Sequence, residues 1–174
     1  DVYKRQGYPS HLGTLIGQGT LRAGIVGFQD RPLTPSEMEQ MKFLLDDQLN
    51  QGALGLSLGL IYPPGSFSPT SELRELARVV QKHKKILAVH MRNEGPNIFQ
   101  AVEEMLSIAE ETGVHLHISH LKLMGKAQWG QAPRLLERIE ASRQRGAVVT
   151  CDQYPYTATS TIPVSYTHLT LPTN

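Results

Sequence analysis

The chain has 174 residues, a formal net charge of +1, and 40% hydrophobic residues. The near balance of charges gives no basic face for nucleic acid, and no apolar run approaches the roughly 20 residues that a membrane helix needs. One cysteine, Cys151, excludes an internal disulfide framework and a Cys-x-x-Cys zinc site. It fits a reducing compartment, so we expect a cytoplasmic protein. The balanced charge and the short apolar runs predict neither nucleic acid nor membrane as partner.

The two ends of the chain are encoded by one DNA element read from opposite strands. One codon choice for residues 1–6, "DVYKRQ", has a reverse complement whose third frame encodes "VSYTH", residues 164–168. The leftover bases fit Pro163 and Leu169. This element resembles the transposon-end adapter of sequencing libraries, so residues 1–6 and 164–174 are set aside as a tag would be. We expect residues 7–163 to be an internal piece of a longer protein, truncated at both ends.

The first predicted helix begins with a capping box. Thr34, Pro35 and Glu37 supply the N-cap residue, the N1 proline and the N3 glutamate. Apolar residues then recur at helical spacing until Gly52, which ends the helix; they are Met38, Met41, Leu45 and Leu49.

Four short apolar runs follow at intervals of about thirty residues, at 52–60, 85–91, 115–122 and 147–154. Each run is rich in branched side chains, as buried parallel strands are. Segments with helical spacing lie between them, at residues 71–83, from residue 97 to a stop at Gly113, and from 132 to a stop at Gly146. The pattern is therefore βαβαβαβ.

This alternation predicts either a doubly wound sheet or a (β/α)₈ barrel, and a barrel needs about 250 residues. No glycine-rich phosphate loop follows any of the strands, which counts against a dinucleotide-binding domain. A proline-rich loop, "IYPPGSFSPT", follows the first strand at the end where barrels build their sites. We predict a partial (β/α)₈ TIM barrel with about four βα units.

Histidines end two successive strands of this pattern. Because side chains alternate along a strand, His90 shares a face with Ala88, and His120 shares a face with Ile118. Adjacent parallel strands lie about 4.8 Å apart, so the two imidazoles could reach one zinc ion. The alternative for each is a buried histidine bonded to a carbonyl, and two histidines alone do not complete a zinc site.

The alternation assigns His115 and His117 to the opposite face, which we expect to be the helix layer. There they would be ordinary hydrogen-bonded histidines. Arg92 and Glu94 follow the second strand, and we expect them to form a solvated ion pair in a loop.

Lys122 lies two residues beyond His120 and keeps its parity, and Asp152 and Tyr154 share a face of the last strand. A cation and a phenol beside a metal suit an anionic substrate. Lys122 and Tyr154 are therefore candidates for substrate binding.

Four motifs read together carry a family resemblance: "GALGLSLGLIYPPGSF", "VHMRNEG", "HISHLK" and "DQYPYTATST", with "IGQGTLR" ahead of them. Over residues 7–163 the chain resembles the N-acyl-D-amino-acid deacylases, or D-aminoacylases, of the amidohydrolase superfamily. The resemblance implies a metal-dependent (β/α)₈ barrel joined to a small β-sandwich. It also implies that a zinc-activated water hydrolyses N-acyl-D-amino acids to a carboxylate and a free D-amino acid.

The resemblance also assigns roles to individual residues. His90 and His120 become ligands of Zn²⁺ on adjacent barrel strands. The substrate's α-carboxylate would be held by Tyr62, Lys122 and Tyr154, and Ser160 would lie near the substrate side chain.

Other parts of the family's site are expected outside this chain. A His-x-His pair and a ligand cysteine lie upstream in the family, and the catalytic aspartate and a carboxylate-binding arginine lie downstream. Cys151 and Asp152 do not match these positions. We therefore expect the full-length parent to be the enzyme, and this piece alone to be unstable and inactive.

Two other functions are compatible with the sequence. A cyclic-amide amidohydrolase, of the dihydropyrimidinase or hydantoinase type, typically carries a carboxylated lysine at the end of the fourth strand. The corresponding stretch here, "GLSLGLIYPP", has no lysine, which counts against that type. The second alternative is a non-catalytic barrel that binds acylated amino acids, and only the missing strands would distinguish it.

Overall fold

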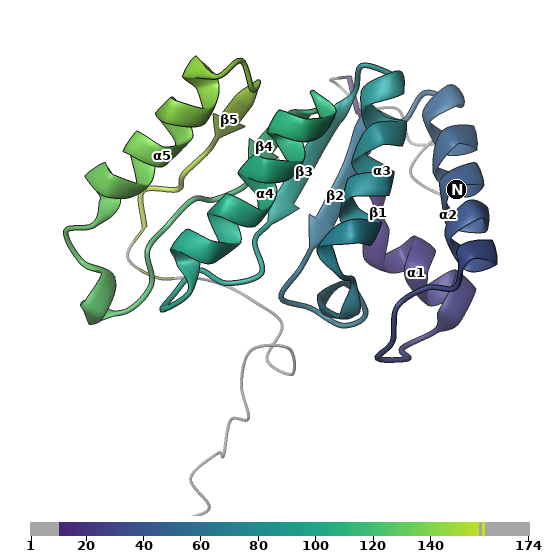
Figure 1. Ribbon diagram of the computed structural model, residues 1–174, viewed down its shortest axis with the longest axis horizontal. Helices are drawn as coiled ribbons and strands as arrows, with labels where there is room; N and C mark the ends of the chain where they lie inside the picture. Colours follow the sequence, from purple (N-terminus) through teal and green to yellow (C-terminus); the bar gives the residue numbers. More distant parts are fainter. Residues whose placement is uncertain (1–10, 157, 159–174) are drawn as a thin grey trace, which may run out of the picture.

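The computed structural model describes residues 11–156 and residue 158. Five parallel strands form one sheet in the order β1-β2-β3-β4-β5, so each strand pairs with its neighbours in sequence (Figure 1). The strands are β1 (Ile16–Gly17), β2 (Gly55–Gly59), β3 (Ile86–His90), β4 (His115–Ile118) and β5 (Val149–Cys151). The helices are α1 (Gln18–Val26), α2 (Pro35–Asn50), α3 (Thr70–Lys82), α4 (Ile98–Thr112) and α5 (Ala132–Gln144), with short 3₁₀ turns η2 (Gly65–Phe67) and η3 (Lys126–Gln128).

The four predicted strands and the four predicted helices are confirmed, and the strands are shorter than the apolar runs. The N-terminal unit of β1 and α1 was not predicted, because a two-residue strand shows no alternation and α1 contains two glycines. None of the helices within the described residues is both long and apolar enough to cross a membrane.

Helix α2 begins as its sequence predicts. The Thr34 hydroxyl accepts from the Glu37 backbone N–H at 3.3 Å, and the Glu37 carboxylate accepts from the Thr34 N–H at 2.7 Å. Both halves of the capping box are formed, so two otherwise unpaired donors at the helix start are satisfied.

The hydrophobic core lies between the sheet and helices α2 to α5, which lie together on one face of it (Figure 1). Alternate strand residues enter this core, including Leu87 and Val89 of β3 and Leu116 and Ile118 of β4. The residues between them, such as His117, therefore lie on the opposite face.

The expectation that His115 and His117 face the helix layer is consequently wrong. The register pairs Ile86 with His115 and Ala88 with His117, so both histidines lie on the face away from the core. His117 there contacts the Thr150 hydroxyl at 2.9 Å and the Asp152 carboxylate at 2.9 Å. The error has a simple cause: alternation tells which residues share a face, but not which face the helices cover.

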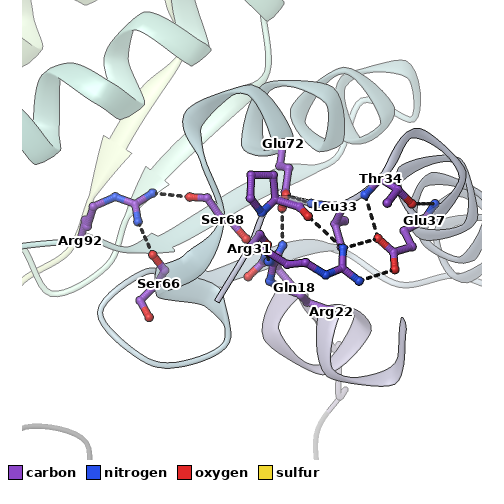
Figure 2. A network of polar contacts seen from close by, with 11 residues as sticks. Gln18, Arg22, Arg31, Leu33, Thr34, Glu37, Ser66, Ser68, Glu72 and Arg92 are labelled. Carbon is purple, nitrogen blue, oxygen red and sulfur yellow. Dashed lines mark hydrogen bonds and ion pairs between the residues drawn. The ribbon is translucent and has the colours of Figure 1, made fainter. Parts of the chain in front are cut away.

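A buried polar network ties helix α1 to the start of α3 (Figure 2). Arg22 is fully buried and contacts Glu72, also buried, at 2.5 Å. Glu72 additionally accepts from the Leu33 N–H at 2.7 Å, and Gln18 donates to the Ser68 hydroxyl at 2.7 Å. The "IGQGTLR" stretch thus anchors the loop that follows β2. This loop contains Tyr62, which belongs to the site described next.

Candidate metal centre

The site is built where β3 and β4 end. His90 is the last residue of β3, and Nδ1 of its ring lies 2.9 Å from Nε2 of His120, two residues beyond β4. Strand alternation alone would direct His120 to the core side together with Ile118. Instead His120 has φ of +44°, in the left-handed region that non-glycine residues rarely adopt, and this turn brings its ring to His90. The two imidazoles meet as predicted, but through a turn that alternation could not anticipate.

Main-chain contacts hold this turn. The Ser119 N–H donates to the Val89 carbonyl at 3.0 Å, and the Leu121 N–H donates to the Asp152 carbonyl at 2.8 Å. The His120 N–H donates to the Asp152 carboxylate. Hydrogen bonds from His117 and from this backbone N–H lower the pKa of Asp152, so its carboxylate is ionised at neutral pH.

Glu94 is the third member of the site. It is buried, with 3% of its surface exposed, and its Oε1 lies 3.0 Å from His120 Nδ1 and 2.7 Å from Lys122 Nζ. His90, Glu94 and His120 can each offer a ligand atom, and those atoms all lie within 4.8 Å of one another. The three residues can therefore hold a metal ion among them.

The prediction of a solvated loop ion pair between Arg92 and Glu94 is wrong. Arg92 instead contacts the Glu104 carboxylate at 3.0 Å and donates to the carbonyls of Ser66 and Ser68 at 3.0 and 2.9 Å. Glu94 turns inward because its carbonyl accepts from the Met124 N–H at 2.7 Å, a contact between two loops. Spacing within the "VHMRNEG" motif gives no sign of this long-range contact.

The protonation of His90 suits metal binding. Burial lowers the pKa of His90 to about 4, an effect that the Glu94 charge opposes and the charges of His120 and Lys122 reinforce. His90 is therefore neutral at pH 7, the state in which imidazole binds a metal. Two nitrogens bound to one tetrahedral zinc at about 2.0 to 2.1 Å would lie about 3.3 Å apart, close to the observed 2.9 Å.

Three of the predicted substrate-binding residues surround this pair. The Tyr62 ring lies 5.0 Å from the His90 ring, and Lys122 Nζ lies 5.3 Å from the centre of the Tyr154 ring. A pocket of about 320 Å³ opens beside Lys122 and Tyr154, and its lining also includes His120, Met124 and Trp129. The arrangement places a cation and aromatic rings next to the candidate metal position.

Some predicted features lie outside the described residues. Ser160 is among them, as are residues 1–6 and 164–174, which were assigned to the adapter.

Two imidazoles and a buried carboxylate at the carboxyl ends of parallel strands define a metal-binding site of the kind that α/β-barrel hydrolases use.

No protein-family model matches the chain. Curated proteins do match it: the chain is 38% identical over 148 residues to a D-aminoacylase of Alcaligenes xylosoxydans xylosoxydans, covering 85% of this chain and 30% of that protein. An N-acyl-D-glutamate deacylase of the same bacterium is 38% identical over 154 residues, 87% of this chain and 31% of its own length.

Solved structures of deacylases are also similar to this chain. The N-acyl-D-glutamate deacylase of Bordetella bronchiseptica, complexed with zinc and a phosphonate that mimics the tetrahedral intermediate, superposes with a TM-score of 0.85 at 34% identity, over 89% of this chain and 33% of that one. A D-aminoacylase described as defining a novel subset of amidohydrolases superposes with a TM-score of 0.78 at 40% identity, over 82% and 30%. An L-hydantoinase of Arthrobacter aurescens shares the fold alone, at 17% identity and a TM-score of 0.51, over 71% and 31%.

The predicted resemblance is therefore confirmed: the chain is homologous to a segment of the D-aminoacylases and N-acyl-D-amino-acid deacylases of the amidohydrolase superfamily. It spans about 30% of the length of the curated relatives that it matches. Its α/β fold with a parallel sheet is that of part of an amidohydrolase barrel, as predicted. These neighbours are metal-dependent proteins.

Proposed function

We propose that this chain is the central part of a zinc-dependent deacylase that hydrolyses the amide bond of N-acyl-D-amino acids. The observation that carries the proposal is the approach of His90 Nδ1 to His120 Nε2, 2.9 Å apart, at the carboxyl ends of two adjacent parallel strands. The homology to deacylases over 85% of the chain supports it. In this proposal residues 7–163 belong to the barrel, and residues 1–6 and 164–174 derive from the adapter.

We assign the metal as Zn²⁺, held by His90 and His120. The zinc complex of the Bordetella deacylase and the two imidazole donors, a ligand type that suits zinc, support this choice. Bound zinc lowers the pKa of a coordinated water and polarises the amide carbonyl. The chain itself supplies neutral imidazole at His90, because burial keeps that ring unprotonated.

The substrate's α-carboxylate is assigned to Lys122, Tyr62 and Tyr154. Lys122 lines the pocket next to His120 and is 18% exposed, so its ammonium is accessible yet partly shielded from water. A charge-assisted contact to the carboxylate would fix one substituent of the α-carbon, which is how a site selects one hand. Ser160 is assigned to the neighbourhood of the substrate side chain.

The general base belongs, in this proposal, to an aspartate of the parent protein beyond this segment. Asp152 accepts hydrogen bonds from His117 and from the His120 backbone N–H, so we assign it to holding the His120 turn rather than to proton transfer. The segment alone is accordingly proposed to be inactive. A reducing, cytoplasmic location is also part of the proposal, in keeping with the single free thiol of Cys151.

The test is amine release by the full gene product. N-acetyl-D-methionine, N-acetyl-D-glutamate and N-acetyl-D-aspartate should be offered beside their L-enantiomers, with and without a zinc chelator. We expect release from at least one D-substrate, none from its L-enantiomer, and loss of activity on chelation. A zinc-loaded enzyme that releases amine from none of the D-substrates would refute the proposal, and hydrolysis of a hydantoin instead would favour the cyclic-amide alternative.

A further inference from the structure

The Glu94 side chain is 3% exposed, whereas the side chains of His120 and Lys122 are 29% and 18% exposed. We infer that Glu94 is a positioning residue: it orients the His120 ring so that Nε2 faces the metal position, and it anchors the Lys122 ammonium beside that position. The inference rests on the proposed function, because it concerns the same site.

Burial makes the role of Glu94 specific. An ionised carboxylate with 3% exposure is costly unless hydrogen bonds and opposite charge compensate for its lost hydration. The compensation comes from Lys122 at 2.7 Å and His120 at 3.0 Å, both of which reach the same oxygen, Oε1. The carboxylate therefore fixes two groups that belong to the loop after β4.

The two edges of the His120 ring have different neighbours. Nε2 lies 2.9 Å from His90 Nδ1, whereas Nδ1 lies 3.0 Å from Glu94 Oε1 and 3.0 Å from Lys122 Nζ. Glu94 thus approaches the ring from the edge away from His90. A direct ligand would lie on the His90 side, so this geometry fits a carboxylate that supports a metal-binding histidine.

Proton placement leads to the same role. When Nε2 of a neutral imidazole binds a metal, Nδ1 must carry the ring proton and needs an acceptor. The ammonium of Lys122 has no lone pair and cannot accept, whereas the carboxylate of Glu94 can. In this structure Lys122 Nζ donates to Nδ1 at 3.0 Å and to Glu94 Oε1 at 2.7 Å. With a metal on Nε2, Nδ1 would carry the proton and Glu94 Oε1, 3.0 Å away, would be its acceptor, while Lys122 would keep its bond to the same carboxylate.

The His120 main chain is held from another direction. Its φ of +44° costs conformational energy for a residue with a side chain, and the N–H contact to Asp152 stabilises that turn. Asp152 holds the His120 backbone, and Glu94 orients the His120 ring. Loss of Glu94 would leave the turn intact but free the ring and the Lys122 ammonium.

The experiment compares Glu94→Gln with wild type in the full-length protein. Zinc affinity is measured by competition with a chromophoric chelator, and KM and kcat are measured separately at saturating zinc. We expect a zinc Kd weakened by about 10- to 100-fold, as is typical when such a supporting carboxylate is lost, and a KM raised severalfold because Lys122 loses its anchor. Glu94→Asp, which keeps the charge, should recover part of the zinc affinity.

Glu72→Gln is the matched control, because Glu72 is another buried carboxylate paired with a cation, and its contacts are with Arg22 and the Leu33 N–H rather than with His90, Glu94 or His120. Below its unfolding transition this variant should keep the zinc Kd within twofold of wild type while its thermal stability falls.

If the zinc Kd of Glu94→Gln also stays within twofold of wild type, the inference is wrong. It is equally wrong if X-ray absorption shows that zinc has lost an oxygen ligand in Glu94→Gln, because Glu94 would then bind the metal directly. If wild type binds zinc but releases no amine, the proposed function fails, whereas the zinc Kd still decides the role of Glu94.

Discussion

The buried pair of Arg22 and Glu72 offers the clearest test of how the N-terminal unit is held (Figure 2). Arg22→Met removes the guanidinium but keeps a side chain of similar length. Glu72 would then keep its hydrogen bond from the Leu33 N–H but lose its charge partner at 2.5 Å, and the Arg31 carbonyl would lose its donor. Breaking one side of a buried ion pair typically costs about 3 to 5 kcal/mol, and both side chains here are at most 6% exposed.

The assay is urea denaturation of the full-length protein, followed by the difference in the free energy of unfolding between wild type and variant. The double variant Arg22→Met with Glu72→Leu tests the cause, since it removes the uncompensated charge as well. We expect the double variant to recover part of the loss and to stay about 1 to 3 kcal/mol below wild type, because the Leu33 N–H remains without its acceptor. A single variant that costs less than 1 kcal/mol, or a double variant that is less stable than the single one, would refute this reasoning.

Three further predictions concern a cap, a strand contact and the metal. The contact with Arg31 lowers the pKa of Glu37 from 4.5 to about 2. This carboxylate therefore stabilises the fold above pH 4.5, and its contribution is lost as the pH falls toward 2. Glu37→Gln should flatten the dependence of the unfolding free energy on pH in that window, and an unchanged dependence would contradict the assignment. Gly55→Ala would place a Cβ atom 2.0 Å from the Ile86 carbonyl oxygen, so the strands must separate, and we expect a loss of about 1 to 3 kcal/mol in urea denaturation rather than a neutral result. His90→Ala should leave the purified full-length protein with far less zinc by elemental analysis, whereas a full zinc content would remove His90 from the ligand set.

Local sequence signals were sufficient for most of the fold. The capping box at Thr34 forms because both of its hydrogen bonds lie within four residues. Helix α4 ends at Gly113, whose φ of +71° is the left-handed conformation that glycine adopts without penalty. The unit of β1 and α1 escaped prediction because it lacks local signals and is held by long-range contacts, such as that between Arg22 and Glu72, 50 residues apart in the chain.

The sequence by itself determined the alternation of strands and helices, the pairing of two histidines at strand ends, and the resemblance to deacylases, because each depends on residue type and on spacing of a few residues. Only the tertiary structure decided that the core covers the face with Leu116 and Ile118, that a left-handed turn returns His120 to His90, and that Glu94 lies buried between His120 and Lys122. Each of these depends on contacts between segments about thirty residues apart, and short-range periodicity carries no information about which distant groups will meet.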